Sequence, residues 1–285
     1  MSILEKAYLK AMSLEAKGTQ KSKQESNISG LVDDCSDLNR MGIETSRPQT
    51  KEAQDIVTSR VGISQMNEVE RYSAKTFIEK RLINSKMEDK QLLDRYRNIR
   101  TKLLSNSKKE NFVTLVTSVV PNTNSALVAG NIAVTFALDE AKTSMLVEAN
   151  INSPSLNELF DMSGKDGLIE YLESDELDAS QILLKTGIPR LRVVPSGLHR
   201  ENSAEYFTST KMAQFIKEIV NRYPDRYPII NAPCVLNSAD TRILIELCDK
   251  VVLVVPYGKC SDEQIMQAAI TIGEEKLAGA VLDGF

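Results

Sequence analysis

Short apolar runs rich in β-branched residues alternate with helical stretches from residue 87 to the end of the chain. The runs suited to strands are residues 112–117, 144–149, 191–195, 229–230, 251–256 and 278–282. An amphipathic stretch at 92–104 precedes them, and further helical stretches fall at 126–138, 212–223 and 238–248. Strands that are apolar on both sides and are joined by helices are typical of a parallel sheet. The sequence therefore predicts an α/β domain with a mostly parallel sheet and helices on both faces.

The first 86 residues have a different character. Residues 1–18 repeat apolar side chains at spacings of three and four, which predicts an amphipathic helix. Residues 19–86 are rich in Ser, Asn, Gln, Thr and charge, so we expect a polar, partly disordered linker ahead of an α/β domain at 87–285. The N-terminal helix would lie on the main domain or dock on a partner, and its apolar stripe suits both.

Composition excludes several classes of protein. No stretch approaches the roughly 20 apolar residues of a membrane helix. The four cysteines form no C-x-x-C pair, and the single histidine, His199, rules out a multi-histidine zinc site. Because the cysteines form no disulfide framework, we expect the chain in the reducing cytoplasm, with any membrane association made through a partner. We expect no metal and no nucleic-acid partner. His199 lies in a polar stretch and is expected on the surface.

Ligands of open parallel sheets bind beyond the carboxyl ends of the strands. Three loops at this edge follow from the predicted strands, at residues 117–126, 147–154 and 230–234. These loops should decide the function.

Four stretches of the chain carry a resemblance to a known family: SILEKAYLKA near the start, IPRLRVVPSG at 188–197, AEYF at 204–207 and RYPDR at 222–226. With these stretches in the same register, the chain from residue 87 onward resembles the bacterial tyrosine autokinases, the P-loop proteins that accompany polysaccharide chain-length regulators. The likeness is strongest to the exosortase-associated branch. The resemblance implies a P-loop NTPase-like fold of the MinD and bacterial tyrosine kinase type.

The resemblance also locates a nucleotide site in which most of the family's residues are replaced. The family's P-G-E-G-K-T motif corresponds here to Pro121, Asn122, Thr123, Asn124, Ser125 and Ala126. Glycines let backbone N–H groups curl around phosphate, the lysine neutralises it, and the hydroxyl holds Mg²⁺. The D-x-D motif becomes Glu148 and Asn150, and the metal-organising aspartate becomes Asn231. Because Mg²⁺ prefers anionic oxygen, we predict no catalytic residue, no metal and no bound ATP.

One further motif of the resemblance is retained in spacing. The family's E-x-x-R-x-x-R, associated with ring formation, corresponds to Asp94, Arg97 and Arg100. Spacing of three places these side chains along one helix face, where arginines would pair with carboxylates of a neighbouring subunit. A solvated helix face with local ion pairs is the equally open alternative.

We therefore expect a catalytically silent relative of these kinases, acting as a binding or regulatory component of exopolysaccharide or capsule biosynthesis and export. Its partners would be itself or a homologous active kinase, and the cytoplasmic part of a membrane polysaccharide chain-length regulator. The alternative is an active ATP- and Mg²⁺-dependent protein-tyrosine autokinase that regulates chain length. The final residues, AGAVLDGF, carry no tyrosine cluster for autophosphorylation. They also lack the basic amphipathic helix that a membrane-positioning ATPase would need.

Overall fold

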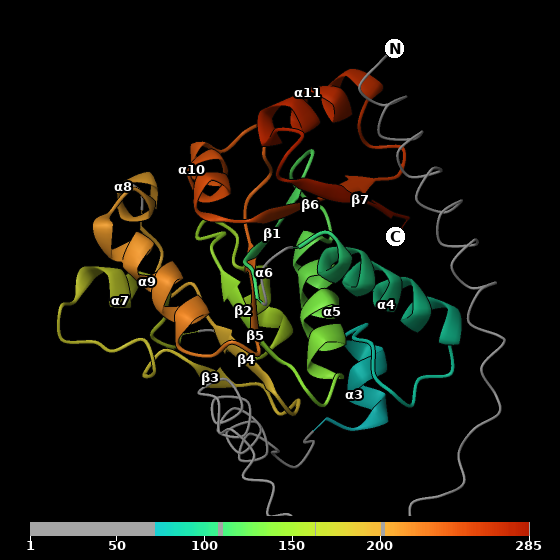
Figure 1. Cartoon of the computed structure of the whole chain (residues 1–285), viewed down its shortest axis with the longest axis horizontal. Helices are drawn as coiled ribbons and strands as arrows, with labels where there is room; N and C mark the ends of the chain where they lie inside the picture. The colour runs from blue at the N-terminus through green and yellow to red at the C-terminus, as the bar shows by residue number, and fades with distance from the viewer. Residues whose placement is uncertain (1–71, 108–110, 163, 201–202, 285) are drawn as a thin grey trace, which may run out of the picture. The chain divides into compact units, whose positions relative to one another are not determined.

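The computed structural model describes residues 72–107, 111–162, 164–200 and 203–284. Their centre is a seven-stranded sheet of order β3-β4-β2-β5-β1-β6-β7 (Figure 1). All neighbouring strands are parallel except β3 and β4. The strands are β1 (Thr114–Ser118), β2 (Thr143–Glu148), β3 (Leu184–Lys185), β4 (Leu191–Val194), β5 (Arg226–Asn231), β6 (Lys250–Pro256) and β7 (Leu277–Asp283).

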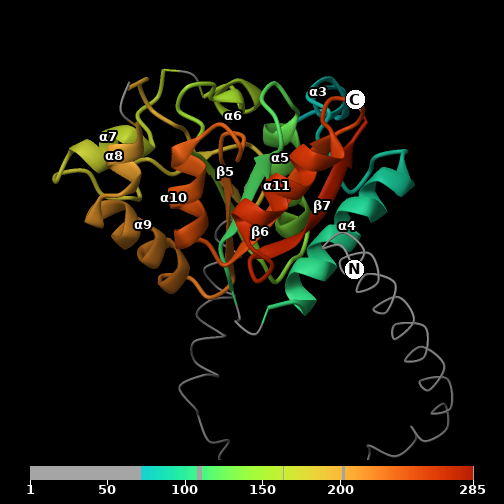
Figure 2. The same cartoon turned by 90° about the horizontal axis from the view of Figure 1, so that it is seen from above.

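Helices cover both faces of this sheet (Figures 1 and 2). Successive side chains of a strand point to opposite faces, so Leu115 of β1 joins one apolar cluster and Val116 joins the other. The second cluster contains side chains from α3 (Ala74–Glu79), α4 (Lys90–Ser105), α5 (Ser125–Ala137) and α6 (Ser155–Leu159). The first contains side chains from α7 (Leu168–Glu173), α8 (Ser203–Phe207), α9 (Thr210–Asn221), α10 (Ala239–Leu247) and α11 (Asp262–Ile272). The predicted α/β architecture is confirmed.

Helix α5 is the element that ties the loop after β1 to the core. It is apolar nearly all round, and every one of its residues except Leu127 is buried. A helix of this kind belongs in a protein interior, where it packs on the sheet. Its first residue lies at the end of the loop that follows β1, so packing of α5 fixes that loop.

The segment that was predicted to be a linker contains a helix, α3, that packs into the core. It lies within residues 19–86, yet Phe77, Leu82 and Ile83 are buried in the cluster around α5. The backbone N–H of Ile83 also donates to Oδ1 of Asn131 in α5, over 2.8 Å. These few apolar residues are too closely grouped to show a period, which is why the sequence pattern missed the helix. Residues 72–86 therefore pack with the α/β domain, whereas the predicted helix at 1–18 lies outside the described residues.

No helix within the described residues is both long and apolar enough to cross a membrane.

Candidate functional site

Three predicted loops meet at one edge of the sheet. Strand β5 pairs with β1 on one side and with β2 on the other, so the carboxyl ends of these three strands are neighbours (Figure 1). The backbone joins them directly, since the N–H of Ala149 donates to the carbonyl of Asn231 and the N–H of Ala232 donates to that of Val116. The structure thus brings the loops at 119–124, 149–154 and 232–238 together, as the strand order requires.

The loop after β1 keeps a glycine-like turn without a glycine. Asn122 has φ of 55°, in the left-handed region that Asn enters more readily than most residues. Pro121 and Asn122 are exposed, Thr123 is half-buried, and Ser125 is buried at the start of α5. The turn at Asn122 therefore has no positively charged side chain among its residues.

Asn124, the N-cap residue of α5, directs its side chain away from the helix end. Its side chain makes no capping hydrogen bond, and its Nδ2 donates instead to Oδ2 of Asp283, over 2.9 Å. Asp283 ends β7 and is 7% exposed. A buried carboxylate thus lies beside the loop in which phosphate binds in P-loop proteins.

Asp283 is a site residue that the sequence analysis missed. Its separation from Asn124 is 159 residues, and no motif spacing connects the two. The connection comes from topology, because β7 pairs with β6 and β6 pairs with β1. The backbone N–H of Tyr257 also donates to the Asp283 carbonyl over 2.8 Å, which fixes the end of β7 against the loop after β6.

Glu148 and Asn231 form a buried pair at the ends of β2 and β5. Both are completely buried, and Nδ2 of Asn231 donates to Oε1 of Glu148 over 2.8 Å. The same carboxyl group accepts hydrogen bonds from the backbone N–H groups of Leu156 at 2.8 Å and Asn150 at 3.0 Å. Burial raises the pKa of Glu148 to about 8, against the effect of these three donors. Near neutral pH the carboxyl group is therefore mostly protonated.

The side-chain oxygen of Asn231 differs from the other polar atoms of this pair. Oδ1 of Asn231 is buried and has no hydrogen-bond partner in the part of the chain that the structure describes. A buried polar atom left unpaired costs free energy, so this atom marks the place where a ligand or water would be accommodated. Among the described residues, no group of three or more His, Cys, Asp or Glu side chains is arranged to hold a metal ion.

Asn150 takes part in a local turn. Its Oδ1 accepts a hydrogen bond from the backbone N–H of Ser153 over 3.3 Å, and its carbonyl accepts a second one from the same group. The position that carries the second D-x-D carboxylate in the family thus holds a neutral amide that closes its own loop.

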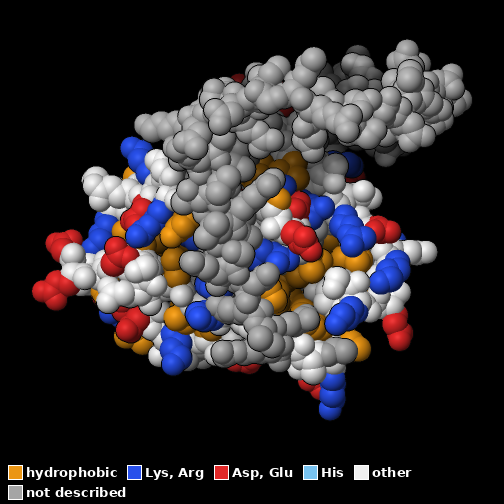
Figure 3. Space-filling view, turned by 60° about the horizontal axis from the view of Figure 1, so that its bottom comes forward, with side chains coloured by type: hydrophobic (Ala, Val, Ile, Leu, Met, Phe, Trp, Pro, Cys, Tyr) orange, Lys and Arg blue, Asp and Glu red, His pale blue; other side chains and the backbone are white. Residues whose placement is uncertain are grey.

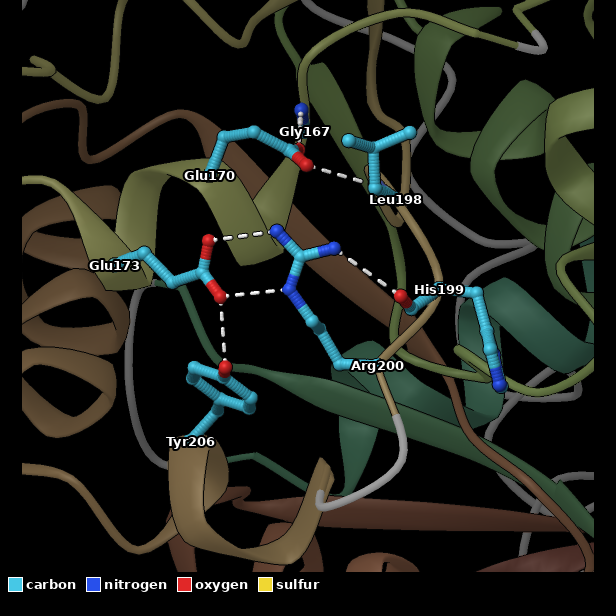
Figure 4. Close-up of polar contacts among 7 residues, drawn as sticks. All are labelled: Gly167, Glu170, Glu173, Leu198, His199, Arg200 and Tyr206. Carbon is cyan, nitrogen blue, oxygen red and sulfur yellow. Dashed lines mark hydrogen bonds and ion pairs between the residues drawn. The ribbon is translucent and has the colours of Figure 1, made fainter.

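The loop after β4 is held by side chains of α7 (Figure 4). Glu170 accepts hydrogen bonds from the backbone N–H groups of Gly167 and Leu198, at 2.8 and 2.9 Å. Glu173 accepts two from Arg200, at 2.8 and 2.9 Å, and these lower the pKa of Glu173. The ring of His199 points away from this network and is exposed, as expected for a surface residue (Figure 4).

Helix α4 places the three charged residues of the retained motif in two environments. Arg97 pairs with Asp94 over 3.2 Å, and both side chains are largely exposed. Arg100 turns inward, and its Nη1 donates to the carbonyl of Thr135 in the last turn of α5, over 2.8 Å. The spacing thus produces a local ion pair and a helix cap rather than three side chains that all face solvent. A role of Asp94, Arg97 and Arg100 in assembly stays a prediction.

Comparison with known proteins extends these observations. No family model matches the chain. It is 29% identical over 194 residues to the tyrosine-protein kinase YwqD of Bacillus subtilis, covering 67% of this chain and 80% of that one. It is 24% identical over 153 residues to the succinoglycan biosynthesis transport protein ExoP of Rhizobium meliloti, covering 53% of this chain and 19% of ExoP.

Solved structures agree with the fold. The chimerical protein CapA2B2 superposes with a TM-score of 0.65 at 20% identity, over 79% of this chain and 98% of that one. The kinase domain of the Escherichia coli tyrosine kinase ETK gives a TM-score of 0.63 at 19% identity, over 78% and 86%. The chain is therefore a homologue of the bacterial tyrosine-protein kinases and has their P-loop NTPase-like fold.

Proposed function

We propose that this protein is a kinase homologue that does not transfer phosphate and that acts by binding other proteins of surface polysaccharide biosynthesis. The observation that carries the proposal is the buried pair of Glu148 and Asn231. It occupies the positions where the family places metal-organising carboxylates, and it is internally hydrogen-bonded.

The phosphate side of the site supports the proposal. The loop from Pro121 to Ala126 has no charged side chain, and Asp283 adds a carboxylate beside it. A nucleoside triphosphate brings several negative charges, which would be repelled by this carboxylate and would find no lysine. The backbone N–H groups at the start of α5 remain, and they would hold an anion only weakly without that charge.

The metal side of the site supports it as well. Magnesium requires oxygen ligands, and its protein sites use one or two carboxylates together with the phosphates of the substrate. Glu148 is mostly neutral near pH 7, and Asn231 offers an amide oxygen. These residues do not fit a MgATP site, so no step of a reaction is assigned to it.

The proposed role in polysaccharide synthesis rests on the relatives. One of them is a succinoglycan biosynthesis transport protein, and this chain covers 19% of its length. We infer that this protein acts on the cytoplasmic side of a membrane polysaccharide chain-length regulator, bound to it or to an active homologous kinase. Its effect would then depend on which partner it binds and not on phosphate transfer by the protein itself.

Isothermal titration calorimetry of MgATP into the full chain tests the proposal. The sequence has no Trp, so calorimetry is preferable to intrinsic fluorescence. We expect no binding with a Kd at or below about 10 μM, equivalent to about 7 kcal/mol, and no incorporation of labelled phosphate. YwqD, measured in parallel, serves as the positive control. Binding in that range would contradict the loss of the nucleotide site, and autophosphorylation on tyrosine would show that the protein is an active kinase.

A further inference from the structure

Strand β7 forms one edge of the sheet and lacks the usual protection of a sheet edge. It pairs with β6 on one side, and among the described residues no strand pairs with its other side (Figures 1 and 2). The opposite edge strand, β3, has only two residues and carries an exposed lysine, Lys185. Strand β7 has seven residues, with no proline and no exposed charged side chain. Short edge strands and edge lysines prevent further pairing, so β7 is the edge that is open to another strand.

The regular part of β7 runs from residue 279 to residue 283. A bulge separates it from Leu277, and residues 279–283 pair in order with residues 252–256 of β6. The carbonyl of Asp283 accepts a hydrogen bond from the backbone N–H of Tyr257, in the loop after β6, so the backbone groups of Asp283 face that strand. Because successive residues of a strand turn their backbone groups to opposite sides, those of Ala280 and Leu282 point to the open edge.

The side chains of the same segment leave apolar surface exposed. Val281 packs on the cluster that contains α4 and α5, so Ala280 and Leu282 point to the other face of the sheet. Ala280 is exposed, Leu282 is 65% exposed, and Tyr257 beside the end of β7 is 73% exposed. On a different side of the molecule, shown in Figure 3, the hydrophobic side chains are interspersed with Lys, Arg, Asp and Glu. The open edge of β7 thus combines unpaired backbone groups with exposed apolar side chains.

Exposed charges of opposite sign lie near the two ends of β7. Glu274 and Glu275 precede the strand, whereas Lys259 lies in the loop after β6 that is bonded to its carboxyl end. All three side chains are exposed, and none makes an ion pair within the described residues. In an antiparallel pair of identical strands, the start of each strand lies beside the end of the other. Each lysine would then face the two glutamates of the second copy, which identifies another copy of this chain as the matching partner.

We propose that β7 pairs with β7 of a second copy, antiparallel and related by a two-fold axis at Val281, so that two sheets join into one. Ala280 would lie opposite Leu282 of the second copy, and their backbone groups would exchange hydrogen bonds. The side chains of Ala280 and Leu282 would cover each other on one face, and the two Val281 side chains would meet on the other. This interface goes beyond the proposed function and involves no nucleotide loop, so its failure would leave that function unaffected.

Light scattering of the full chain across a dilution series tests the interface. We expect a mass of two 31.7 kDa chains that falls to one on dilution. Leu282→Lys places a charge at the open edge and should raise the dissociation constant of the dimer about tenfold or more. Ile78→Lys makes the same change at a side chain of α3 that is 76% exposed, and it should leave the dissociation constant unchanged.

A charge exchange tests the orientation of the two strands. Lys259→Glu should weaken the dimer, because it places a third acidic side chain beside Glu274 and Glu275 of the second copy. Adding Glu274→Lys and Glu275→Lys to this variant should restore the dimer, since the attraction returns with its signs exchanged. Arg97→Ala on α4 should leave the dimer intact. Dissociation by Arg97→Ala and not by Leu282→Lys would place the interface on α4 and overturn the proposal.

Cysteine cross-linking tests the register. Across the axis, the two Val281 residues would form a non-hydrogen-bonded pair with Cα atoms about 4.5 Å apart, which a disulfide can bridge. Val281→Cys should therefore give a linked dimer on mild oxidation that the parent does not give. Ala280→Cys should give little, because the two copies of this residue lie diagonally, about 7–8 Å apart. The proposal is overturned if the parent is a monomer throughout the dilution series, if Leu282→Lys dimerises as the parent does, or if Ala280→Cys cross-links as well as Val281→Cys.

Discussion

Nδ2 of Asn231 lies 2.8 Å from Oε1 of Glu148 and joins the carboxyl ends of β5 and β2 through a side-chain hydrogen bond. Both residues stand where the homologous kinases are expected to place carboxylates. Two carboxylates this close would repel each other without a cation between them, whereas an amide and a carboxyl group attract. The pair therefore stabilises the site without a metal.

The first prediction concerns the pH dependence of stability. The pKa of Glu148 is raised from 4.5 to about 8 in the folded protein, so the folded state holds this proton more tightly than the unfolded state. Its contribution is greatest below pH 4.5 and is lost as the pH rises towards 8, by up to about 1.4 kcal/mol per pKa unit. We expect Glu148→Gln to flatten the decline between pH 5 and 8 in urea unfolding. Glu79→Gln, an exposed control on α3, should decline as the parent does.

The second prediction concerns the metal. Asn231→Asp places a second carboxyl group against Glu148, and we expect a lower melting temperature at pH 8 because the two charges repel. Magnesium chloride should restore it, because paired carboxylates attract a divalent cation. Asn231→Ala should show no such response. If Mg²⁺ leaves the melting temperature of Asn231→Asp unchanged, these two positions alone do not form a metal site.

The third prediction concerns repair of the nucleotide loop. Asn122→Gly, Asn124→Gly, Ser125→Lys and Ala126→Thr restore the family's residues in the loop and first turn of α5, and Asn231→Asp restores the carboxylate at the end of β5. The backbone N–H groups at the start of α5 remain as an anion site. We expect this variant to bind MgATP measurably by calorimetry. The same variant without Ser125→Lys is the matched control and should bind much more weakly. A folded repaired variant that ignores MgATP would mean that the surrounding pocket has also closed.

The fourth prediction concerns Asp283. In the repaired variant, Asp283→Asn removes a carboxylate next to the loop, and we expect ATP affinity to rise several-fold. Because the effect is electrostatic, the gain should shrink as salt is raised beyond about 0.15 M, where the screening length is near 8 Å. Asp262→Asn in α11 removes an exposed charge as a control. Equal gains in both variants would indicate a general effect of net charge.

The fifth prediction separates the two arginines of α4. Arg97 belongs to an exposed pair, so Arg97→Ala should change stability by no more than about 0–1 kcal/mol. Arg100 caps α5, so Arg100→Ala should cost about 1–2 kcal/mol. If this face mediates assembly, Arg97→Ala should reduce the mass seen by light scattering when the protein is mixed with a homologous kinase. If the mass is the same for the parent and for Arg97→Ala at low and high salt, this face of α4 is exposed to solvent and does not mediate assembly.

The sequence predicted the sheet well because its central strands are buried on both sides and each contains a short apolar run. Residues 251–256, for example, appear as β6, and residues 126–138 correspond closely to α5. Strand β3 has only two residues, half-buried and exposed, so no pattern marks it. Helix α3 was missed because its contribution to the core depends on contacts with α5, which local spacing does not encode.

Some residues of the candidate site could be identified from the sequence, and others could not. Positions such as Asn122 and Asn231 were found because they follow strands at the expected edge. The carboxylate of Asp283 and the inward turn of Arg100 were not, since both depend on partners far away in the chain. Motif spacing identifies residues on one element, but it does not reveal what a neighbouring element places against them.

The hydrogen bond from Arg100 to the carbonyl of Thr135 couples α4 to α5. This helix is 13 residues long, or about 20 Å at 1.5 Å per residue. One end begins at the loop after β1, and the other end is gripped by a side chain of α4. The buried helix α5 therefore connects α4 to the loop after β1. A partner that displaces α4 would shift the C-terminal end of α5 and thereby change the conformation of the loop after β1, which the partner does not contact.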